Sequence, residues 1–349
     1  MSATITYPSG TNTYVPNLEG SNNLLVDFGR NVQDFAINRY TQIAPVKTNV
    51  GLYTVMTVEE AGRILDTDGA NFAWADGQDF PERNEGNESF QFNSFNTIRR
   101  GFGYKLGRLS TEQAAWDIQS QHARIKAQQA MTMRTYFVMN ALTTTANYSS
   151  NHYSAVSSIS GNSGNFAQST TARQDIKRSL NYAAQQIMLD TLSAVKGQQL
   201  ILVIGPALAA SLAATQEIVD YIKGSKDAAA AIKGEVPGYN KMFGLPDQLY
   251  GYELIVDDAS YVTSRKGATR AASFVWPSTT AVMLARPGDL VAPSNEGPNF
   301  STCTLFMKEE MTVENDIDQW HRLTRGRVTE DYQAALTAPV TGFVFTSAA

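Results

Sequence analysis

Apolar and polar positions alternate along the chain from residue 46 to 107, a pattern typical of paired strands. The alternation is clearest in VGLYTVMTV (50–58) and in ESFQFNSFNTIRRGFGYKL (88–106). Between the two runs lies a turn-rich segment with the acidic residues Asp66, Asp68, Asp76, Asp79, Glu82, Glu85 and Glu88. The pattern predicts a long β-hairpin with an acidic tip. Because an isolated hairpin is only marginally stable in water, we expect this hairpin to pack against another chain.

A helical pattern without Gly or Pro follows, from Leu109 to about Leu142. Ser110 and Gln113 fit a capping box at its start. One apolar residue recurs every seven positions, at Leu109, Trp116, Ala123, Ala130 and Phe137. At ~1.5 Å per residue the helix would be about 50 Å long, which is long for a globular domain.

Helices and strands alternate in the second half, which predicts a mixed α/β domain. A Ser/Asn/Gly-rich segment, 148–165, predicts an exposed loop, and a helix then opens near Thr171 and Gln174. The apolar face of this helix is expected to hold Ile176, Leu180, Ala183 and Ile187.

The remaining elements are predicted from short apolar runs. QLILVIG (199–205) predicts a buried central strand, and Pro206 suits the first turn of the next helix. Further predictions are a helix at 215–223, a strand in YGYELIVDDAS (250–260), a strand pair in ASFVWPSTTAVMLARPG (272–288), and strands around a charged turn from about 303 onward.

Residues 1 to about 40 are polar and rich in Ser, Thr, Asn and Gly. Helical spacing is limited to Val32, Phe35, Ala36, Arg39 and Tyr40. Such a segment buries too little apolar surface to offset its ordering entropy. We therefore expect an extended arm that is ordered only against other chains.

Composition excludes several classes of function. The chain has 349 residues, 28 basic and 33 acidic, for a formal charge of −5, so a basic clamp for duplex nucleic acid is not expected. Cys303 is the only cysteine, which excludes internal disulfides and multi-cysteine metal sites. No signal peptide pattern and no apolar run near the ~20 residues of a membrane helix is present. Charged residues make up 17% of the chain, below the usual fraction of about a quarter. This low charge content favours a surface that is partly covered by other copies of the chain.

Histidine and carboxylate spacing does not assemble a catalytic or metal site. His122, His152 and His321 lie in different predicted elements without a His-x-x-x-His pair, so solvated or interface histidines are expected. Asp257 and Asp258 are adjacent on a strand and point to opposite faces, as do Glu309 and Glu310.

Arg99, Arg100, Gly101 and Gly103 lack the spacing of a phosphate-binding loop. We interpret the two arginines as partners for the acidic hairpin of a neighbouring copy. Cys303 is interpreted as a small buried hydrophobe, because no histidine motif accompanies it. We therefore expect no enzymatic activity, no cofactor and no metal.

The order of parts resembles the Hong Kong 97-type major capsid protein of tailed bacteriophages: polar arm, long acidic hairpin, spine helix, mixed α/β domain and returning strands. The resemblance covers the whole chain and rests on this order rather than on one diagnostic motif. The segments that carry it are ILVIGPALAASL (201–212), LYGYELIVDDAS (249–260), ASFVWPSTTAVMLARPGDL (272–290) and MKEEMTVENDIDQWHRLTRGRVTEDYQAALTAPVTGFVF (307–345).

The resemblance implies an α+β fold with five parts. They are an N-terminal arm (1–45), an extended hairpin or E-loop (46–107), a P-domain with spine helix, Ser-rich loop and second helix (108–198), an axial α/β A-domain (199–302), and returning P-domain strands with a C-terminal end strand (303–349).

The implied function is a structural shell protein of the virion. It would self-assemble through hexamers and pentamers into an icosahedral shell around phage double-stranded DNA, without sequence recognition and without a membrane. Implied partners are other copies of the chain, a portal and decoration proteins, with assembly in the host cytoplasm. Because only about 45 polar, largely non-helical residues precede the hairpin, we expect a separate scaffolding protein or none, and no proteolytic maturation. The alternatives are an encapsulin-type nanocompartment around a cargo protein, or a soluble α/β enzyme.

Contacts between copies are expected mainly from the hairpin. The candidate residues are Arg63, Phe72, Trp74, Asp76, Asp79, Phe80, Glu82, Arg83, Glu85, Phe90, Phe92, Arg99 and Arg100. In the family's type member a hairpin lysine forms a covalent bond with a neighbour's asparagine. No lysine lies between Thr48 and Tyr104 here, and arginine is not a nucleophile, so we expect a shell held non-covalently.

Overall fold

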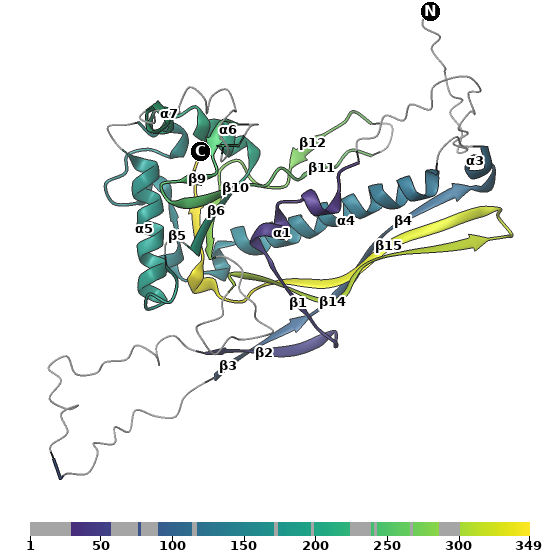
Figure 1. Ribbon diagram of the computed structural model, residues 1–349, viewed down its shortest axis with the longest axis horizontal. Helices are drawn as coiled ribbons and strands as arrows, with labels where there is room; N and C mark the ends of the chain where they lie inside the picture. The colour runs from purple at the N-terminus through teal and green to yellow at the C-terminus, as the bar shows by residue number, and fades with distance from the viewer. Residues whose placement is uncertain are drawn as a thin grey trace, which may run out of the picture.

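The computed structural model of the chain describes residues 29–56, 76–77, 90–113, 117–170, 174–196, 199–223, 239–240, 243–265, 268–285 and 301–349. These residues form two parts of different shape (Figure 1). One part is elongated, with a long helix lying along a four-stranded sheet. The other is a rounder α/β body at one end of that sheet.

The four-stranded sheet is built around a long antiparallel ribbon near the C-terminus. In spatial order its strands are β1 (Gln42–Pro45), β14 (Cys303–Asp318), β15 (Leu323–Leu336) and β4 (Ile98–Gly107). β1 runs parallel to β14, and β15 runs antiparallel to both of its neighbours. The predicted C-terminal strands and the turn between them are confirmed.

The predicted single spine helix is two helices, α3 (Arg108–Gln113) and α4 (Ile118–Thr143). Asp117 is the N-cap of α4, and its carboxylate accepts from the backbone N–H groups of Gln119 (3.0 Å) and Ser120 (3.1 Å). The predicted capping box was therefore misplaced, since Ser110 lies within α3. No Gly or Pro marks this boundary, and the favoured N-cap residue Asp117 is the signal for it.

The seven-residue apolar lane is confirmed within α4, where Ala130 is buried and Ala123 and Phe137 pack against the core. It is wrong for Leu109 of α3, which is 59% exposed. The buried face of α4 is wider than the lane and follows the spacing of three, four and seven that an α-helix on a sheet requires. That face consists of Ala130, Met131, Arg134, Thr135, Val138, Met139 and Leu142.

The α/β body is organised around a six-stranded sheet whose central strand, β6 (Leu200–Ile204), is buried throughout. β6 lies parallel to β10 and antiparallel to β13. The order is β5 (Tyr153–Ala155), β16 (Phe343–Thr346), β13 (Ala281–Ala285), β6, β10 (Tyr252–Val256) and β9 (Gln248–Leu249). This sheet therefore includes strands from outside 199–302.

Each face of the six-stranded sheet packs into a different core. Leu200, Leu202 and Ile204 join the helices α5 (Asp175–Asp190) and α6 (Pro206–Ala213) on one face. Ile201 and Val203 point to the other face, where α4 and the N-terminal segment pack. The body and the elongated part thus share a continuous core.

Most predictions for the α/β body are confirmed. Ile176, Leu180, Ala183 and Ile187 are fully buried on one face of α5, Pro206 opens α6, and α7 (Gln216–Lys223) is present. The predicted strand pair is wrong, because β12 (Ala272–Phe274) pairs with β11 (Ser260–Val262), while β13 lies between β6 and β16.

The Ser-rich segment was predicted as an exposed loop, but it packs closely on the α/β body. Val156, Ile159 and Phe166 are at most 3% exposed, because these apolar residues are spaced between the small polar ones. The segment contains the 3₁₀ helices η4 (Ser150–His152) and η5 (Val156–Ser158), and it is flanked by η3 (Thr145–Asn147) and η6 (Phe166–Gln168). Short elements elsewhere are β7 (Tyr239–Asn240), β8 (Leu245–Pro246) and η8 (Pro339–Thr341).

The described N-terminal segment belongs to the subunit's own core. It contains η1 (Val32–Asp34) and α1 (Ile37–Tyr40), and Phe35, Ile37 and Tyr40 are at most 3% exposed. The expectation of an arm ordered only by neighbours is therefore wrong for residues 29–45. Three large apolar side chains in six positions bury enough surface to fix the segment. Residues 1–28 of the predicted arm lie outside the described residues.

Candidate intersubunit surfaces

The described part of the hairpin consists of two strands, β2 (Val50–Met56) and β3 (Phe90–Asn96). They are antiparallel, with Val50 opposite Asn96 and Met56 opposite Phe90. The predicted second strand does not continue into residues 98–107. It breaks at Thr97, and β4 then pairs with β15 of the same subunit.

One face of the β2/β3 ribbon is fastened to the subunit's own sheet. The ring of Phe95 stacks on Phe306 of β14 at 4.5 Å between centroids, and the Tyr53 ring lies 5.2 Å from Phe306. A Cβ at Gly51 would lie 2.5 Å from the Phe95 ring, so this close approach requires glycine. The base of the hairpin is thereby held at a defined angle.

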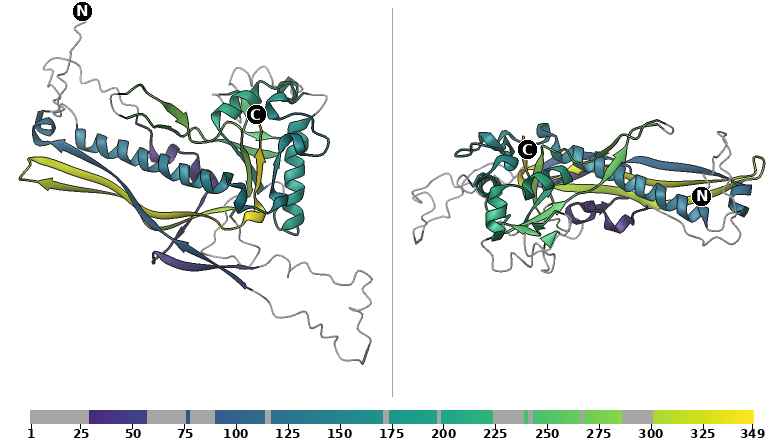
Figure 2. Two further views of the ribbon diagram at one scale, coloured as in Figure 1. Left: turned by 180° about the vertical axis from the view of Figure 1, so that it is seen from behind. Right: turned by 90° about the horizontal axis from the view of Figure 1, so that it is seen from above.

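The ribbon lies across the sheet from α4. Leu305 and Met307 of β14 belong to the core that contains α4, whereas Phe306 between them packs against Phe95. Alternate residues of a strand point to opposite faces. In Figure 1 and in the left view of Figure 2, the β14/β15 ribbon likewise lies between α4 and β2/β3.

The other face of the ribbon is apolar and open. Val50, Leu52 and Phe92 are 64%, 68% and 61% exposed. Val50 and Leu52 lie two apart on β2, and Thr54 of the same face is opposite Phe92. We call Val50, Leu52 and Phe92 the outer ribbon face. Contiguous exposed apolar side chains of this kind mark a surface that another protein covers.

The structure describes five of the predicted contact residues. Phe90 and Phe92 lie on β3, Asp76 lies in an exposed turn, and Arg99 and Arg100 lie on β4. The others lie outside the described residues: Arg63, Phe72, Trp74, Asp79, Phe80, Glu82, Arg83 and Glu85. Their contacts with neighbouring copies remain predictions.

Both arginines of β4 have partners in their own subunit. Arg99 forms an ion pair with Glu309 at 3.2 Å. The Arg100 guanidinium donates to the backbone oxygen of Tyr332 at 2.7 Å and lies 4.3 Å from the Phe137 ring centroid. These contacts hold β4 to the sheet and to α4, and an additional contact of either arginine with a neighbour remains a prediction.

A buried ion pair fixes α4 to the sheet beside Arg100. Arg134 of α4 binds Glu330 of β15, and the two side chains are 8% and 2% exposed. Burial raises the pKa of Glu330, and the charge of Arg134 opposes this effect. Breaking this pair would leave a buried charge without its partner, which is energetically costly. The pair therefore holds α4 in a fixed position on the sheet.

A second exposed apolar surface lies at the tip of the β14/β15 ribbon. Trp320 is 95% exposed and Ile317 is 72% exposed. The carboxylate of Asp318 accepts from the backbone N–H (3.1 Å) and Nδ1 (2.8 Å) of His321 and also binds Arg325. These hydrogen bonds lower the pKa of Asp318 and shape the turn that presents Trp320.

Sequence reasoning missed the exposed residues of the tip. Trp320 stands in the run DQWHR, where every neighbour is polar or charged and none can share a core with it. A lone tryptophan inside a charged turn between two strands is the signal that could have identified it.

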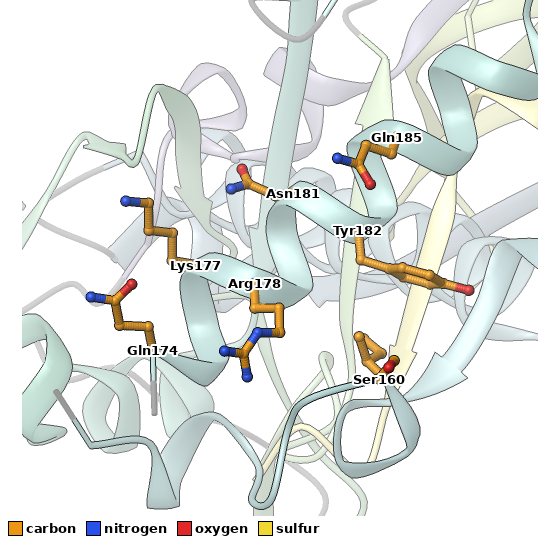
Figure 3. Close-up of a pocket in the computed structure, with 8 residues that line it drawn as sticks. Ser160, Gln174, Lys177, Arg178, Asn181, Tyr182 and Gln185 are labelled. Carbon is orange, nitrogen blue, oxygen red and sulfur yellow. The ribbon is translucent and has the colours of Figure 1, made fainter. Parts of the chain in front are cut away.

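An open polar hollow lies beside α5 (Figure 3). Its volume is ≈ 370 Å³, and its lining includes Lys177, Arg178, Asn181, Tyr182 and Ser160. Among the lining residues no carboxylate or histidine is present to act as a base for Ser160. The lining therefore does not assemble an activated serine nucleophile.

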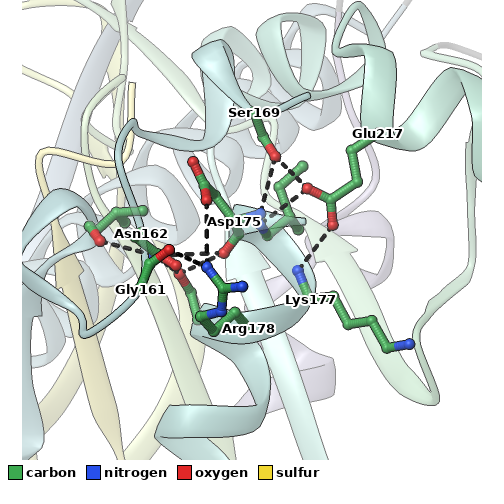
Figure 4. A network of polar contacts seen from close by, with 10 residues as sticks. Gly161, Asn162, Ser169, Asp175, Lys177, Arg178 and Glu217 are labelled. Atoms are coloured by element: carbon green, nitrogen blue, oxygen red, sulfur yellow. Dashed lines mark hydrogen bonds and ion pairs between the residues drawn. The ribbon is translucent and has the colours of Figure 1, made fainter. Parts of the chain in front are cut away.

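The carboxylate of Glu217 on α7 caps the neighbouring helix α5 (Figure 4). It accepts from the backbone N–H groups of Ile176 (3.1 Å) and Lys177 (3.0 Å), and from the hydroxyls of Ser169 and Tyr250. These donors would otherwise be unsatisfied at the helix start. The cluster joins α5 to α7 and is structural.

The histidines have structural environments. His152 was predicted to be solvated or at an interface, but it is fully buried, with Nε2 2.7 Å from Asp190 and Nδ1 2.8 Å from the Gly342 oxygen. The ring of His122 stacks on Tyr104 at 5.8 Å, and burial and nearby Lys126 lower its pKa. His321 belongs to the ribbon tip.

The remaining candidate groups are also structural. Burial raises the pKa of the Cys303 thiol to about 12, which agrees with a buried small hydrophobe. Asp257 accepts from Tyr40 while Asp258 pairs with Arg30, so the two carboxylates diverge as predicted. Among the described residues, no group of three or more His, Cys, Asp or Glu side chains could hold a metal ion. No described helix is long and apolar enough to cross a membrane.

Comparison with known proteins identifies the fold. No family model and no curated protein sequence matches the chain. A phage-related protein from Bordetella bronchiseptica RB50 is 14% identical, with a TM-score of 0.58 over 90% of this chain and 91% of that one. The capsid of cyanophage P-SCSP1u gives a TM-score of 0.55 at 10% identity, over 98% and 96% of the two chains. The mature capsid of bacteriophage PhiM1 gives 0.53 at 11%, over 95% and 91%.

These matches span nearly the full length of both partners in each comparison, so they concern the arrangement of all the parts. The chain therefore has the mixed α+β, Hong Kong 97-type fold of phage capsid proteins.

Proposed function

We propose that the chain is the major capsid protein of a tailed bacteriophage. The observation that carries the proposal is the match to phage capsid structures over 95% and 98% of this chain. A capsid subunit needs a rigid body and elements that reach other copies. The continuous core supplies the first, and the β2/β3 and β14/β15 ribbons supply the second.

The exposed apolar residues support assembly. The outer ribbon face and the tip residues Ile317 and Trp320 lie on different strands and at separate places on the subunit. Each subunit thus offers at least two surfaces to its neighbours, and a closed lattice multiplies contacts that are weak singly. Permanent interfaces of this kind bury about 2,000 Å² or more.

The proposal extends to the architecture of the particle. Hexamers and pentamers form an icosahedral shell that encloses double-stranded DNA without reading its sequence. The subunit is non-catalytic, and the shell is part of the virion and assembles in the host cytoplasm. A portal, a separate scaffolding protein and decoration proteins are the further partners that the resemblance implies.

The shell is proposed to be held without covalent links. No lysine lies between Thr48 and Tyr104, so the hairpin offers no side-chain amine for an isopeptide bond. Apolar burial at the outer ribbon face is then the main source of free energy, at about 25 cal/mol per Å².

Negative-stain microscopy of the purified chain, together with light scattering, tests the proposal. We expect closed icosahedral particles that, after boiling in reducing detergent, run as one band at 38.1 kDa. A monodisperse monomer at all concentrations would overturn a shell function. Native particles filled with one cargo protein and lacking nucleic acid, by their 260/280 nm absorbance ratio, would replace the phage capsid by a nanocompartment.

A further inference from the structure

Acidic residues are unevenly distributed over the fold. The chain carries 33 Asp and Glu, yet none lies in α4 (Ile118–Thr143) and none lies between residues 259 and 285. These two segments contain the basic residues Arg124, Lys126, Arg134, Arg265, Lys266 and Arg270. In a chain with net charge −5, these two segments thus carry only positive formal charges, of which Arg134 is paired with Glu330 of β15.

The segment 259–285 begins with a narrow ribbon formed by β11 (Ser260–Val262) and β12 (Ala272–Phe274). Ser260 is opposite Phe274, and the N–H of Thr263 donates to the Ala271 oxygen at 3.1 Å, which continues the ribbon beyond the strands. Arg265 and Arg270 lie exposed towards its end. Among the described residues neither arginine forms an ion pair.

The end of this ribbon has the composition of a phosphate-contacting loop rather than of a protein interface. Residues 263–271 read TSRKGATRA, which combines basic side chains with small and hydroxyl-bearing ones and contains no large apolar residue. The apolar residues Tyr261, Val262 and Phe274 are 36%, 50% and 48% exposed at the base, so a contact with another protein would be made there rather than at the end. A protein interface would need apolar anchors at the end itself.

The basic ribbon lies on the α4 side of the four-stranded sheet. The ring of Tyr261 is 6.4 Å from Tyr136 of α4, and Figure 1 shows β11/β12 running beside this helix. At the ribbon's base the two carboxylates Asp257 and Asp258 are engaged by Tyr40 and Arg30. The positive charge of the ribbon is therefore not neutralised locally.

The two described strands of the hairpin, β2 and β3, lie on the opposite side of the same sheet. They pack on Phe306, which points away from the core that contains α4. The sequence between these strands, 57–89, holds nine acidic residues and two arginines. In a shell one subunit thick, the two sides of the sheet become its two surfaces, so acidic and basic segments are expected on opposite surfaces.

We propose that the α4 side of the sheet faces the lumen, and that Arg265 and Arg270 of the β11/β12 ribbon contact the phosphate backbone of the enclosed nucleic acid. The proposal rests on the function proposed above and adds the contacting residues and the orientation of the subunit. The contacts are electrostatic and independent of base sequence, because the ribbon end carries point charges and small side chains. A neighbour's acidic hairpin is the less favoured partner because the hairpin strands β2 and β3 lie on the other side of the sheet from the basic ribbon.

Salt dependence of binding tests the contact residues. Full-length unassembled subunits are titrated with a random-sequence DNA duplex, and fluorescence anisotropy is followed at increasing NaCl. Each lost phosphate contact lowers the slope of log K against log salt by about 0.9, so Arg265→Ser with Arg270→Ser should lower it by about 1.8. The charge-matched control, Lys47→Ser with Lys308→Ser near the hairpin strands, should leave the slope unchanged. Equal slopes for wild type and the Arg265/Arg270 variant would overturn the proposal.

Thiol labelling of assembled shells tests the orientation. The native Cys303 is fully buried, so an introduced cysteine is the accessible thiol. A polyethylene-glycol maleimide too large to cross the shell should modify Thr48→Cys shells, because Thr48 is exposed just before β2, and should spare Ser264→Cys shells. Both should react after dissociation in urea. Modification of Ser264→Cys in intact shells would place the ribbon outside and refute the orientation.

Two outcomes separate this proposal from the proposed function. If wild-type chain forms no particles, the capsid function fails, whereas normal particles combined with unchanged salt slopes refute the nucleic-acid contact alone. If the Arg265/Arg270 variant has a wild-type circular dichroism spectrum and salt slope but no longer assembles, the ribbon contacts a second copy instead, and the proposal is wrong.

Discussion

The phenolic hydroxyl of Tyr40 donates a 2.6 Å hydrogen bond to Oδ2 of Asp257, and the two side chains are buried together. The N–H of Ala259 donates to Oδ1 of the same carboxylate at 3.1 Å. The contact joins the N-terminal segment to the end of β10, where the basic ribbon begins. It therefore fixes a part of the chain that its polar composition marks as an arm.

Removing this donor should destabilise the subunit. Tyr40→Phe leaves a buried carboxylate oxygen without its hydrogen bond, which should lower the free energy of unfolding by about 1–3 kcal/mol in a urea titration. Tyr153→Phe is the matched control, because Tyr153 is 38% exposed and should tolerate the change. Equal midpoints for the two variants would show that the Tyr40 bond contributes nothing.

The stability of the subunit should depend on the protonation of Asp257. Burial raises the pKa of this carboxyl above the ordinary 3.8, and the bonds from Tyr40 and Ala259 offset this only in part. Between 3.8 and the raised value the folded state binds more protons than the unfolded state, so the Asp257 contribution falls as the pH rises through that window. It is then constant at higher pH.

Asp257→Asn isolates this contribution from the other carboxylates. The unfolding free energy of wild type minus that of Asp257→Asn should decrease from pH 4 towards neutral pH and then level off. Chemical denaturation at a series of pH values measures the difference. A difference that increases with pH would mean that the folded pKa is lowered and that burial is not the dominant effect.

Removing one partner of the buried pair between Arg134 and Glu330 should lower the free energy of unfolding strongly, whereas replacing both partners with apolar residues should lower it little. Arg134→Met leaves Glu330 buried without its partner, which should cost about 3–5 kcal/mol of unfolding free energy. Arg134→Met with Glu330→Leu should recover most of that loss, because no charge is stranded. The exposed pair of Arg327 and Glu314, at 2.5 Å, is the control, and Arg327→Met should cost about 0–1 kcal/mol. A double variant no better than Arg134→Met would contradict this account.

Two truncations should separate assembly from folding at the N-terminus. Deletion of residues 1–28 leaves Phe35, Ile37 and Tyr40 in the core, so circular dichroism should be near normal while sedimentation shows small oligomers. Deletion of residues 1–41 removes these three buried side chains and should unfold or strongly destabilise the subunit. Normal shells from the shorter deletion, or a normal urea midpoint for the longer one, would each refute the corresponding half of the prediction.

The spacing of apolar residues was sufficient to predict an element and its buried face where that element packs against one neighbour. The spacing of Ile176, Leu180, Ala183 and Ile187 predicts the buried face of α5, and the apolar run of β6 predicts a central strand. It failed where long-range pairing decides the outcome. Nothing local distinguishes β3 from β4 in the alternating run, and the break at Thr97 follows from β4 pairing with β15 far along the chain.

The candidate surfaces, too, could be predicted from the sequence only where they do not depend on contacts between distant parts of the chain. Phe92 could be predicted as a contact residue from alternation alone, but the exposure of Val50 and Leu52 depends on which face of the ribbon meets Phe306. The partners of Arg100 come from α4 and β15, distant in sequence, so they could not be inferred from its position. Composition gave no indication of the Tyr40 anchor, because three buried side chains suffice in an otherwise polar segment.

The outer ribbon face should control assembly without controlling folding. Leu52 and Phe92 are more than 60% exposed in the subunit, so Leu52→Ser and Phe92→Ser should leave the urea midpoint nearly unchanged. Each such side chain contributes about 1.5–3 kcal/mol when another copy covers it. Since 1.4 kcal/mol corresponds to tenfold, each substitution should raise the subunit concentration needed for assembly by about tenfold to a hundredfold.

Phe95→Ala is the matched control on the other face of the ribbon, which packs on Phe306, and it should impair folding rather than assembly alone. Phe95 is 7% exposed and stacked on Phe306, so its loss should destabilise the subunit by about 3–5 kcal/mol and release the hairpin base. Light scattering over a concentration series measures assembly, and urea titration measures folding. If Leu52→Ser and Phe92→Ser assemble at the wild-type concentration, the outer ribbon face is not covered in the shell and the prediction is wrong.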